Sequence, residues 1–403
     1  MFKERIKTHH SAMSEGNKYI MGVRGIGEAL MKENTGSENN STIYIHIPFC
    51  NKICSFCNMR RSLQKPSENY ADLIVEEIKE YSKYEYVKTT KFDAVYFGGG
   101  TPTTLSKEEL VKILKALRSN FSFTRDAEFT IETTVTELSN DKIEALIENG
   151  VNRFSVGIQT FDNNGRKKMG RIGSGEAAFK KLETLKSYEG VTVSMDLIYN
   201  YPEQTMDNLI DDLEKIKKLK LDGFSMYSLI NMKETSIDNA QNEKNDETMF
   251  YAISSIMREN GYEFLELTKM VKSDRYRYIM NRHKGADTLP LGAGAGGSIN
   301  GLALMNPIKL DEYEKSIKEF SLRKGMQFRE EYKEVICFKG DIQTVYLPKN
   351  EELYVDKDKY RLYLANLLEN EMVQKVEDGY RLTTKGIFWG NTISRELSCM
   401  IER

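Results

Sequence analysis

Three of the five cysteines of this chain lie close together, at Cys50, Cys54 and Cys57. Thiolates bind soft metals, and three close thiolates can hold three irons of a [4Fe–4S] cluster, which leaves the fourth iron without a protein ligand. An iron with an open position can bind a substrate or a cofactor, so such a cluster can be catalytic. A structural zinc site is the alternative. Zinc normally takes four ligands, however, and the nearby His46 lies on the strand expected before the loop.

The elements that position these cysteines follow a repeating pattern. Between about residues 42 and 233, short β-branched or aromatic segments alternate with amphipathic ones, which predicts about six strand–helix units. We expect strands at 43–48, 94–97, 129–133, 154–158, 193–199 and 224–230. We expect helices at 68–82, 107–117, 141–149, 175–187, 207–218 and 246–259. This α/β alternation indicates a parallel sheet, either an open doubly wound sheet or an incomplete barrel, with chemistry at the carboxyl ends of the strands.

Polar residues and glycines stand at the ends of successive predicted strands. Glycines there let backbone groups approach a ligand closely, and a carboxylate can accept hydroxyl groups. Each residue alone also suits a plain turn, a cap or a solvated charge, but together at neighbouring strand ends they fit one site. The candidates are Gly99, Gly100, Thr101, Glu132, Gln159, Arg171 and Asp196.

Composition limits the class of protein. The 403 residues carry 58 Lys and Arg against 60 Asp and Glu, a net charge of −2 that gives no case for a nucleic-acid or membrane-surface partner. No apolar run is long enough to span a membrane, and the first residues show no secretory signal, so we expect a cytoplasmic protein. Five cysteines make no disulfide framework. The other two, Cys337 and Cys399, are expected to be core thiols.

Length and pattern predict three parts. Residues 1–41 form a polar extension with a short helix around 19–31. Residues 42–310 hold the strand–helix repeat and an elaboration of it. That elaboration includes the glycine-rich stretch 291–298, which looks like a P-loop but lacks the GK[ST] ending, so we expect it to let the backbone pack closely. Residues 311–403 form a mostly helical, winged-helix-like domain.

The spacing Cx3Cx2C after the first strand of a six-fold repeat resembles the radical SAM superfamily. The segment YIHIPFC at 44–50 resembles the subfamily of oxygen-independent coproporphyrinogen III dehydrogenase. The resemblance implies a partial (β/α)6 barrel with a [4Fe–4S] cluster on the three cysteines, which would reduce S-adenosylmethionine (SAM) to a 5′-deoxyadenosyl radical. The amino and carboxylate groups of SAM would chelate the open iron. It also implies SAM contacts for the seven strand-end candidates named above and for Tyr44 in the first strand.

Departures from this pattern narrow the choice of branch. The coproporphyrinogen enzyme has a fourth cysteine where this chain has Met59, and its N-terminal Arg-Tyr-Thr-Ser-Tyr-Pro motif is missing from 1–41. The haem-chaperone branch carries His-Asn-x-x-Tyr-Trp where residues 278–283 read YIMNRH. Segments 291–300 and 382–389 look like the anaerobic haem-degrading radical SAM methyltransferases, the anaerobilin synthases.

The resemblance therefore implies anaerobic haem degradation, in which methyl transfer opens the macrocycle to a linear tetrapyrrole and frees the iron. A flavodoxin or ferredoxin would supply electrons. The alternatives are decarboxylation of coproporphyrinogen III and a haem-binding chaperone. A histidine is a common haem ligand, and paired arginines can meet propionates, although a surface histidine or a solvated basic loop is at least as ordinary. The substrate candidates are His9, His10, His283, Arg60 and Arg61.

Overall fold

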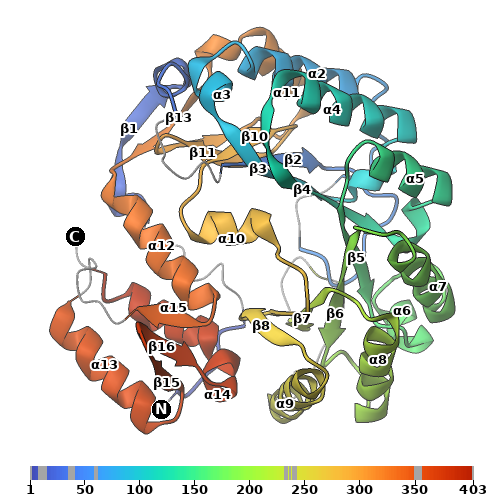
Figure 1. Ribbon diagram of the computed structural model, residues 1–403, viewed down its shortest axis with the longest axis vertical. Coiled ribbons are helices and arrows are strands. Elements are labelled where there is room, and N and C mark those ends of the chain that lie inside the picture. The colour runs from blue at the N-terminus through green and yellow to red at the C-terminus, as the bar shows by residue number, and fades with distance from the viewer. Residues whose placement is uncertain are drawn as a thin grey trace.

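The computed structural model describes residues 2–7, 16–34, 41–58, 62–230, 235, 237, 243–348 and 356–401. Its centre is a curved sheet whose six middle strands run parallel in chain order, as the repeat predicts (Figure 1). They are β2 (Thr42–Ile47), β3 (Lys91–Gly99), β4 (Ser122–Thr134), β5 (Arg153–Gln159), β6 (Thr192–Tyr199) and β7 (Gly223–Ser228). The predicted α/β partial barrel is confirmed.

Six main helices follow the strands and cover the outer face of the sheet (Figure 1). Two of them begin with reciprocal capping boxes, at Ser106 and at Thr205, which pair the backbone N–H groups that a helix start leaves open. Each buries one apolar stripe against the strands, so the predicted periodicity corresponds to real faces. They are α2 (Tyr70–Tyr81), α4 (Lys107–Asn120), α5 (Asn140–Glu148), α7 (Gly175–Lys186), α8 (Met206–Leu219) and α9 (Glu243–Glu259).

The sheet extends beyond this barrel on both sides. Next to β7 lie β9 (Lys269–Val271) and β8 (Glu263–Glu266), both antiparallel. On the other side β10 (Thr288–Leu291) runs parallel to β2. Four antiparallel strands then complete the order, namely β11 (Gly296–Ile299), β12 (Leu302–Met305), β13 (Lys324–Phe328) and β1 (Ile20–Gly25). Residues 324–328, assigned from the sequence to the C-terminal part, therefore belong to the main sheet.

The prediction of a single helix around residues 19–31 is wrong. The chain there forms a short 3-10 turn (Gly16–Tyr19), then β1, and only afterwards the five-residue helix α1 (Ile26–Leu30). Strand β1 pairs with β13, more than 300 residues later, so a tertiary contact overrides the local propensity. A pairing at this distance leaves no periodic signal in a short segment.

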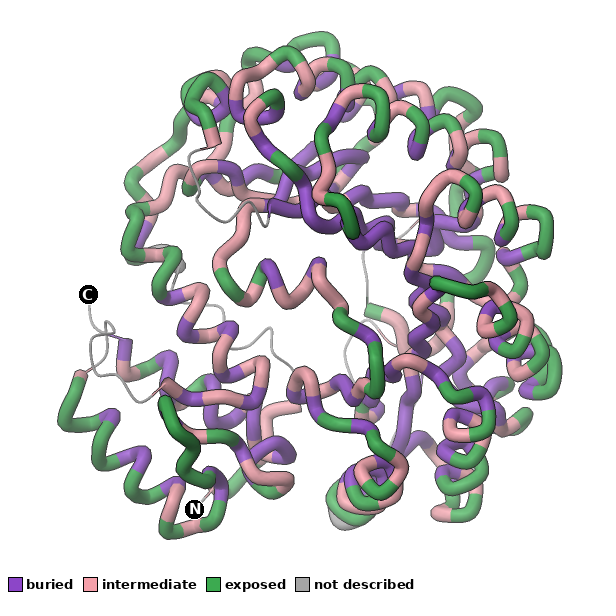
Figure 2. Tube along the Cα trace, in the orientation of Figure 1, coloured by how far each residue is buried: buried purple, intermediate pink, exposed green. Residues whose placement is uncertain are grey.

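Helix α10 (Arg277–His283) lies inside the curve of the sheet (Figure 1) and packs against β3. The buried part of the chain is concentrated in the strands around it (Figure 2). Within the described residues, no helix is both long and apolar enough to cross a membrane.

The C-terminal region combines helices with a small sheet in the order β14-β16-β15, the pattern typical of a winged helix. Its elements are α12 (Glu331–Gln343), β14 (Tyr346–Pro348), α13 (Lys357–Glu369), β15 (Val373–Val376), β16 (Gly379–Leu382), α14 (Thr384–Phe388) and α15 (Gly390–Ser398). The first residues of the chain pack on it, with the rings of Phe2 and Trp389 5.2 Å apart. The N-terminal residues are therefore in contact with the C-terminal region.

Candidate active site

A cavity of about 460 Å³ lies at the carboxyl ends of the barrel strands. It gathers residues that are far apart in the sequence but stand at successive strand ends, as expected for a parallel barrel. The predicted residues that line it are Cys50, Cys54, Cys57, Gly99, Gly100, Thr101, Glu132, Gln159, Arg171 and Asp196.

The cysteine loop is anchored to the end of β3. The Gly100 N–H donates to the Ile47 carbonyl at 2.8 Å, and the Thr101 N–H donates to the Phe49 carbonyl at 2.8 Å. A Cβ at Gly100 would lie 2.5 Å from the Phe49 oxygen and 3.0 Å from Cys50 Sγ. Position 100 therefore needs glycine, because any side chain would push the loop away from the strand.

The other side of the loop is held by the segment after β5. The Ser55 N–H donates to the Met169 carbonyl at 3.2 Å, and Ser55 Oγ donates to the Lys168 carbonyl at 2.9 Å. Arg171 donates from Nη1 to Cys54 Sγ at 3.3 Å and from Nη2 to the Gly157 carbonyl. Two barrel strands thus fix the position of the cysteine loop.

The donor set suits a [4Fe–4S] cluster better than a single ion. In the described part of the chain, no three His, Cys, Asp or Glu side chains are close enough to share one metal ion. In an iron–sulfur cluster each thiolate binds an iron of its own, so the sulfurs stand around the group rather than on one point. Cys50 is buried, while Cys54 and Cys57 are half-buried, and all three border the cavity.

Two carboxylates lie deep in the barrel below the loop. Glu132 accepts from the Tyr96 hydroxyl at 2.6 Å and from the Gly99 N–H at 3.3 Å. Burial raises the pKa of Glu132 to about 7, and burial also raises the pKa of Asp196. Both side chains are half-buried and border the cavity, so their oxygens can accept from hydroxyl or ammonium groups of a ligand there.

Two polar atoms in the cavity wall have no partner in the described structure, although both are buried. They are Gln159 Oε1 and Arg171 Nε. Buried polar atoms are normally paired, so both atoms indicate a polar ligand at this point. The backbone of Gln159 has φ of +67°, a strained conformation for a residue with a side chain, and such strain concentrates at ligand sites. These observations fit a bound polar cofactor.

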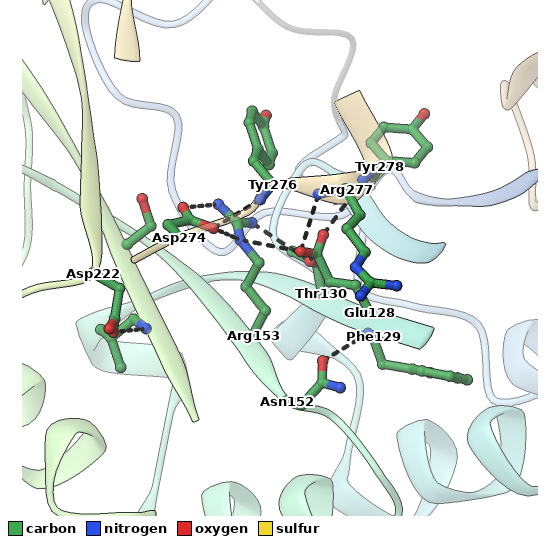
Figure 3. Close-up of polar contacts among 12 residues, drawn as sticks. Glu128, Phe129, Thr130, Asn152, Arg153, Asp222, Asp274, Tyr276, Arg277 and Tyr278 are labelled. Atoms are coloured by element: carbon green, nitrogen blue, oxygen red, sulfur yellow. Dashed lines mark hydrogen bonds and ion pairs between the residues drawn. The ribbon is translucent and has the colours of Figure 1, made fainter. Parts of the chain in front are cut away.

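A buried ionic network that no sequence motif predicts lies at the opposite end of the barrel (Figure 3). Arg153 Nη2 lies 2.7 Å and Lys269 Nζ lies 3.2 Å from the same Asp274 oxygen, and all three side chains are buried. Both cations also lie over the ring of Tyr276, at 4.4 and 4.7 Å. Arg153 is the first residue of β5, so the network lies at the end of the barrel away from the cysteine loop.

Two predicted residues do not line the cavity. The Tyr44 hydroxyl lies 2.9 Å from His46 Nδ1, and its ring stacks at 6.1 Å on Tyr278 of α10. His283 Nε2 lies 2.7 Å from Glu266 Oε1, because the end of α10 faces β8. His9, His10, Arg60 and Arg61 lie outside the described residues.

Sequence reasoning missed two cavity residues that come from the two ends of the chain. Lys7 and Asn391 both border the cavity. Neither belongs to a motif, and a sequence gives no sign that its two ends meet. Only the packing of residues 2–7 on the C-terminal region brings them together.

Comparison with known proteins identifies the barrel. The family model of the radical SAM superfamily matches residues 44–216, from β2 to α8. Residues 44–216 form a radical SAM domain. Members of this superfamily use a [4Fe–4S] cluster and SAM, the two groups for which the cavity of this domain has suitable donors.

Relatives of this chain match nearly its whole length. It is 29% identical over 391 residues to the anaerobilin synthase of Escherichia coli O157:H7, covering 92% of this chain and 87% of that one. It is 28% identical to the heme chaperone HemW of Lactococcus lactis, covering 88% and 96%. It is 25% identical to the oxygen-independent coproporphyrinogen III oxidase of Escherichia coli, covering 87% and 83%.

A solved structure shows the same fold. The coproporphyrinogen III oxidase of Escherichia coli, described as a radical SAM enzyme, superposes with a TM-score of 0.75 at 23% identity. The match covers 91% of this chain and 90% of that chain. The barrel, its sheet extensions and the C-terminal region are therefore one shared architecture.

Proposed function

We propose that this protein is a radical SAM methyltransferase that degrades haem without oxygen, opening the macrocycle to a linear tetrapyrrole and releasing the iron. The observation that carries the proposal is that three cysteines, the half-buried carboxylates of Glu132 and Asp196, and several apolar side chains border one cavity. The choice of haem rests on the similarity to an anaerobilin synthase over 92% of the chain. Met59, where the coproporphyrinogen enzyme has its fourth cysteine, supports that choice.

Each strand end has a role in this proposal. Cys50, Cys54 and Cys57 hold the [4Fe–4S] cluster. When bound, the cluster and SAM supply an adenosyl radical and a methyl group. The backbone of the glycine loop at 99–101 meets the amino group of SAM, and Glu132 accepts from its ribose hydroxyls.

The remaining SAM contacts come from β5 and β6. Gln159 Oε1 and Arg171 Nε, which lack partners in the described structure, bind polar groups of SAM, as does the Asp196 carboxylate. Tyr44 does not border the cavity, and it supports the site through the hydrogen bond between its hydroxyl and His46. Such fixed donors and acceptors act without reorganisation, because the barrel already holds them in place.

Haem itself and the electron source complete the proposal. His9 and His10 are the candidate axial ligands, and Arg60 and Arg61 are candidates for the haem propionates. His283 is a weaker candidate, because its Nε2 already pairs with Glu266. Low-potential electrons come from a flavodoxin or ferredoxin, and we propose that the reaction takes place in the cytoplasm.

A haem chaperone is the second candidate. It is favoured by the 28% identity to the heme chaperone of Lactococcus lactis, of which this chain covers 96%. A chaperone binds haem stoichiometrically and leaves the macrocycle intact. Decarboxylation of coproporphyrinogen III is the third, disfavoured by Met59 at the fourth cysteine position.

The test is incubation of the reconstituted, reduced protein with haem and SAM in the absence of oxygen. Loss of the haem absorbance in step with SAM consumption supports the proposal. Haem absorbance that persists while SAM is cleaved normally would contradict it. Stoichiometric haem binding without any turnover would favour the chaperone, and carbon dioxide release from coproporphyrinogen III would favour the decarboxylase.

A further inference from the structure

The first described residues form a strap that ties the C-terminal region to the barrel. We call residues 2–7 the N-terminal strap. Arg5 Nε donates to the Phe388 carbonyl at 2.7 Å, and its guanidinium carbon lies 3.9 Å from the centre of the Phe388 ring. The Ile6 N–H donates to Thr392 Oγ1 at 2.9 Å. These contacts on two successive residues fix the position of the residue that follows, Lys7.

The strap carries an excess positive charge. Arg5 Nη1 and Lys7 Nζ lie 2.7 and 2.8 Å from the same oxygen of Asp246 on α9. Burial opposes ionisation of Asp246, but the two cations outweigh it and hold the pKa of this carboxyl below its usual range. Two cations against one ionised carboxylate leave one positive charge. Because all three side chains are largely buried, that charge is poorly screened by solvent.

Lys7 borders the candidate active site together with Asn391, the residue next to the strap contact at Thr392. The other charged side chains of the cavity wall are Lys52, Glu132, Glu137, Arg171 and Asp196, which lie on the cysteine loop, on β4 and β6, and in the segments that follow β4 and α6. Lys7 instead pairs with Asp246, whose carboxyl also meets Ser228 at the end of β7, and Asn391 comes from α15. An ammonium group and a side-chain amide together are suitable donors for a carboxylate.

The cavity wall also carries large apolar side chains, Ile198, Tyr227 and Ile172, which we call the apolar ledge. Ile198 and Tyr227 are paired across β6 and β7, so they face the same side of the sheet, and both border the cavity. Tyr227 is 43% exposed and Ile172, also in the cavity wall, is 49% exposed, unusually open for large apolar residues that line a pocket. A ledge of this kind can bind an apolar, aromatic face.

We propose that Lys7, assisted by Asn391, binds a carboxylate of the substrate while the apolar body of the substrate lies on the ledge of Ile198, Tyr227 and Ile172. This inference rests on the proposed function, and it assigns carboxylate recognition to the two ends of the chain. The ligand class is a flat apolar molecule with at least one carboxylate, such as a porphyrin propionate. Lys7 acts as a specificity residue, not as a reacting group.

The chain contains its own reporter for this site. Trp389 is the single tryptophan, and it lies in the C-terminal region that the strap contacts, with its ring 5.2 Å from that of Phe2. A bound porphyrin should quench its fluorescence. We would titrate the full-length, cluster-reconstituted protein with protoporphyrin IX and with its dimethyl ester, which has the same ring system but no carboxylate.

We expect the wild-type protein to bind the diacid more tightly than the ester. Lys7→Met should weaken binding of the diacid about tenfold and leave the ester unchanged, since one charge-assisted hydrogen bond is lost. Lys7→Arg should restore the affinity for the diacid. Lys3→Met is the matched control, because Lys3 is an exposed lysine of the same strap, and it should leave both affinities unchanged.

Three results would overturn the inference. An unchanged diacid affinity in Lys7→Met would show that Lys7 does not meet the carboxylate. Equal weakening of diacid and ester would show that Lys7 supports only the packing of the strap. If the wild-type protein binds neither porphyrin, the tetrapyrrole proposal fails as well. The first two results leave that proposal standing, so the two failures are distinguishable.

Discussion

The guanidinium of Arg171 donates from Nη1 to the sulfur of Cys54 across 3.3 Å, joining two residues 117 positions apart. Its Nη2 donates to the carbonyl of Gly157 in β5, so the same side chain links the cysteine loop to a strand of the barrel. The loop is therefore held in place by the scaffold, as a site that must position reacting groups requires.

Replacement of Cys54 by serine tests the proposed cluster. A hydroxyl is a poor ligand for iron in such clusters, which prefer thiolates. Cys54→Ser should therefore lose the iron–sulfur absorbance after anaerobic reconstitution, together with SAM cleavage. Cys399→Ser is the control and should retain both. The expectation that Cys399 is a core thiol is wrong, because Cys399 is exposed, and Cys337 is only half-buried. A Cys54→Ser protein with normal absorbance and SAM cleavage would show that the ligand set is assigned wrongly.

Gly100→Ala tests the close contact between the glycine loop and the cysteine loop. Its Cβ would lie 2.5 Å from the Phe49 oxygen, so the backbone must shift and carry Cys50 with it. We expect iron content and SAM affinity to fall at least tenfold, measured by iron assay and anaerobic calorimetry. Gly27→Ala is the control, because a Cβ there meets nothing within 4 Å. Equal behaviour of both variants would contradict this role of Gly100.

The buried pair of Glu77 and Arg323 should dominate the stability of the region behind the cysteine loop. Arg323 Nη1 lies 2.5 Å from the fully buried Glu77, which also accepts from the Gly292 N–H at 2.8 Å. Glu77→Gln leaves a buried cation without its partner, at a cost of about 3–5 kcal/mol in the free energy of unfolding. Chemical denaturation measures it.

The control for that experiment is Glu80→Gln on the same helix. Glu80 pairs with the exposed Lys83, and an exposed pair contributes about 1 kcal/mol or less. Similar losses in the two variants would mean that the buried pair has no special weight.

Asp212 should make the stability of the fold depend on pH. It accepts from Thr160 Oγ1 and from the Phe161 N–H, both at 2.7 Å, and burial raises its pKa to about 7. An unfolded Asp titrates near pH 3.9. The folded chain thus holds this proton more tightly, and the contribution to stability is fully present below pH 3.9, approximately, and is lost as the pH rises to about 7.

Asp212→Asn removes this titration. From pH 5 to pH 7.5 the variant should lose about 2.5 kcal/mol less stability than the wild-type protein, by denaturation at each pH. Asp211→Asn, next along the helix but exposed, should keep the wild-type pH dependence. Parallel pH profiles for Asp212→Asn and wild type would refute the assignment.

The sequence predicted the parts of this molecule that have a period or a motif. The six parallel strands follow from alternating apolar segments, and the common cavity of Cys50, Glu132 and Asp196 follows from their places at strand ends. The structure corrected what depends on distant partners. Strand β1 exists because it pairs with β13, and Lys7 reaches the cavity because Ile6 binds Thr392. No local pattern encodes such contacts.

The most direct test of the proposed function is to determine the mass of the tetrapyrrole product. The reconstituted protein, a reduced flavodoxin, haem and SAM with an isotope-labelled methyl group are incubated without oxygen and analysed by mass spectrometry. The account predicts a metal-free linear tetrapyrrole that carries the label, formed only when the three cysteines are intact. Haem recovered unchanged, with SAM fully cleaved, would contradict it.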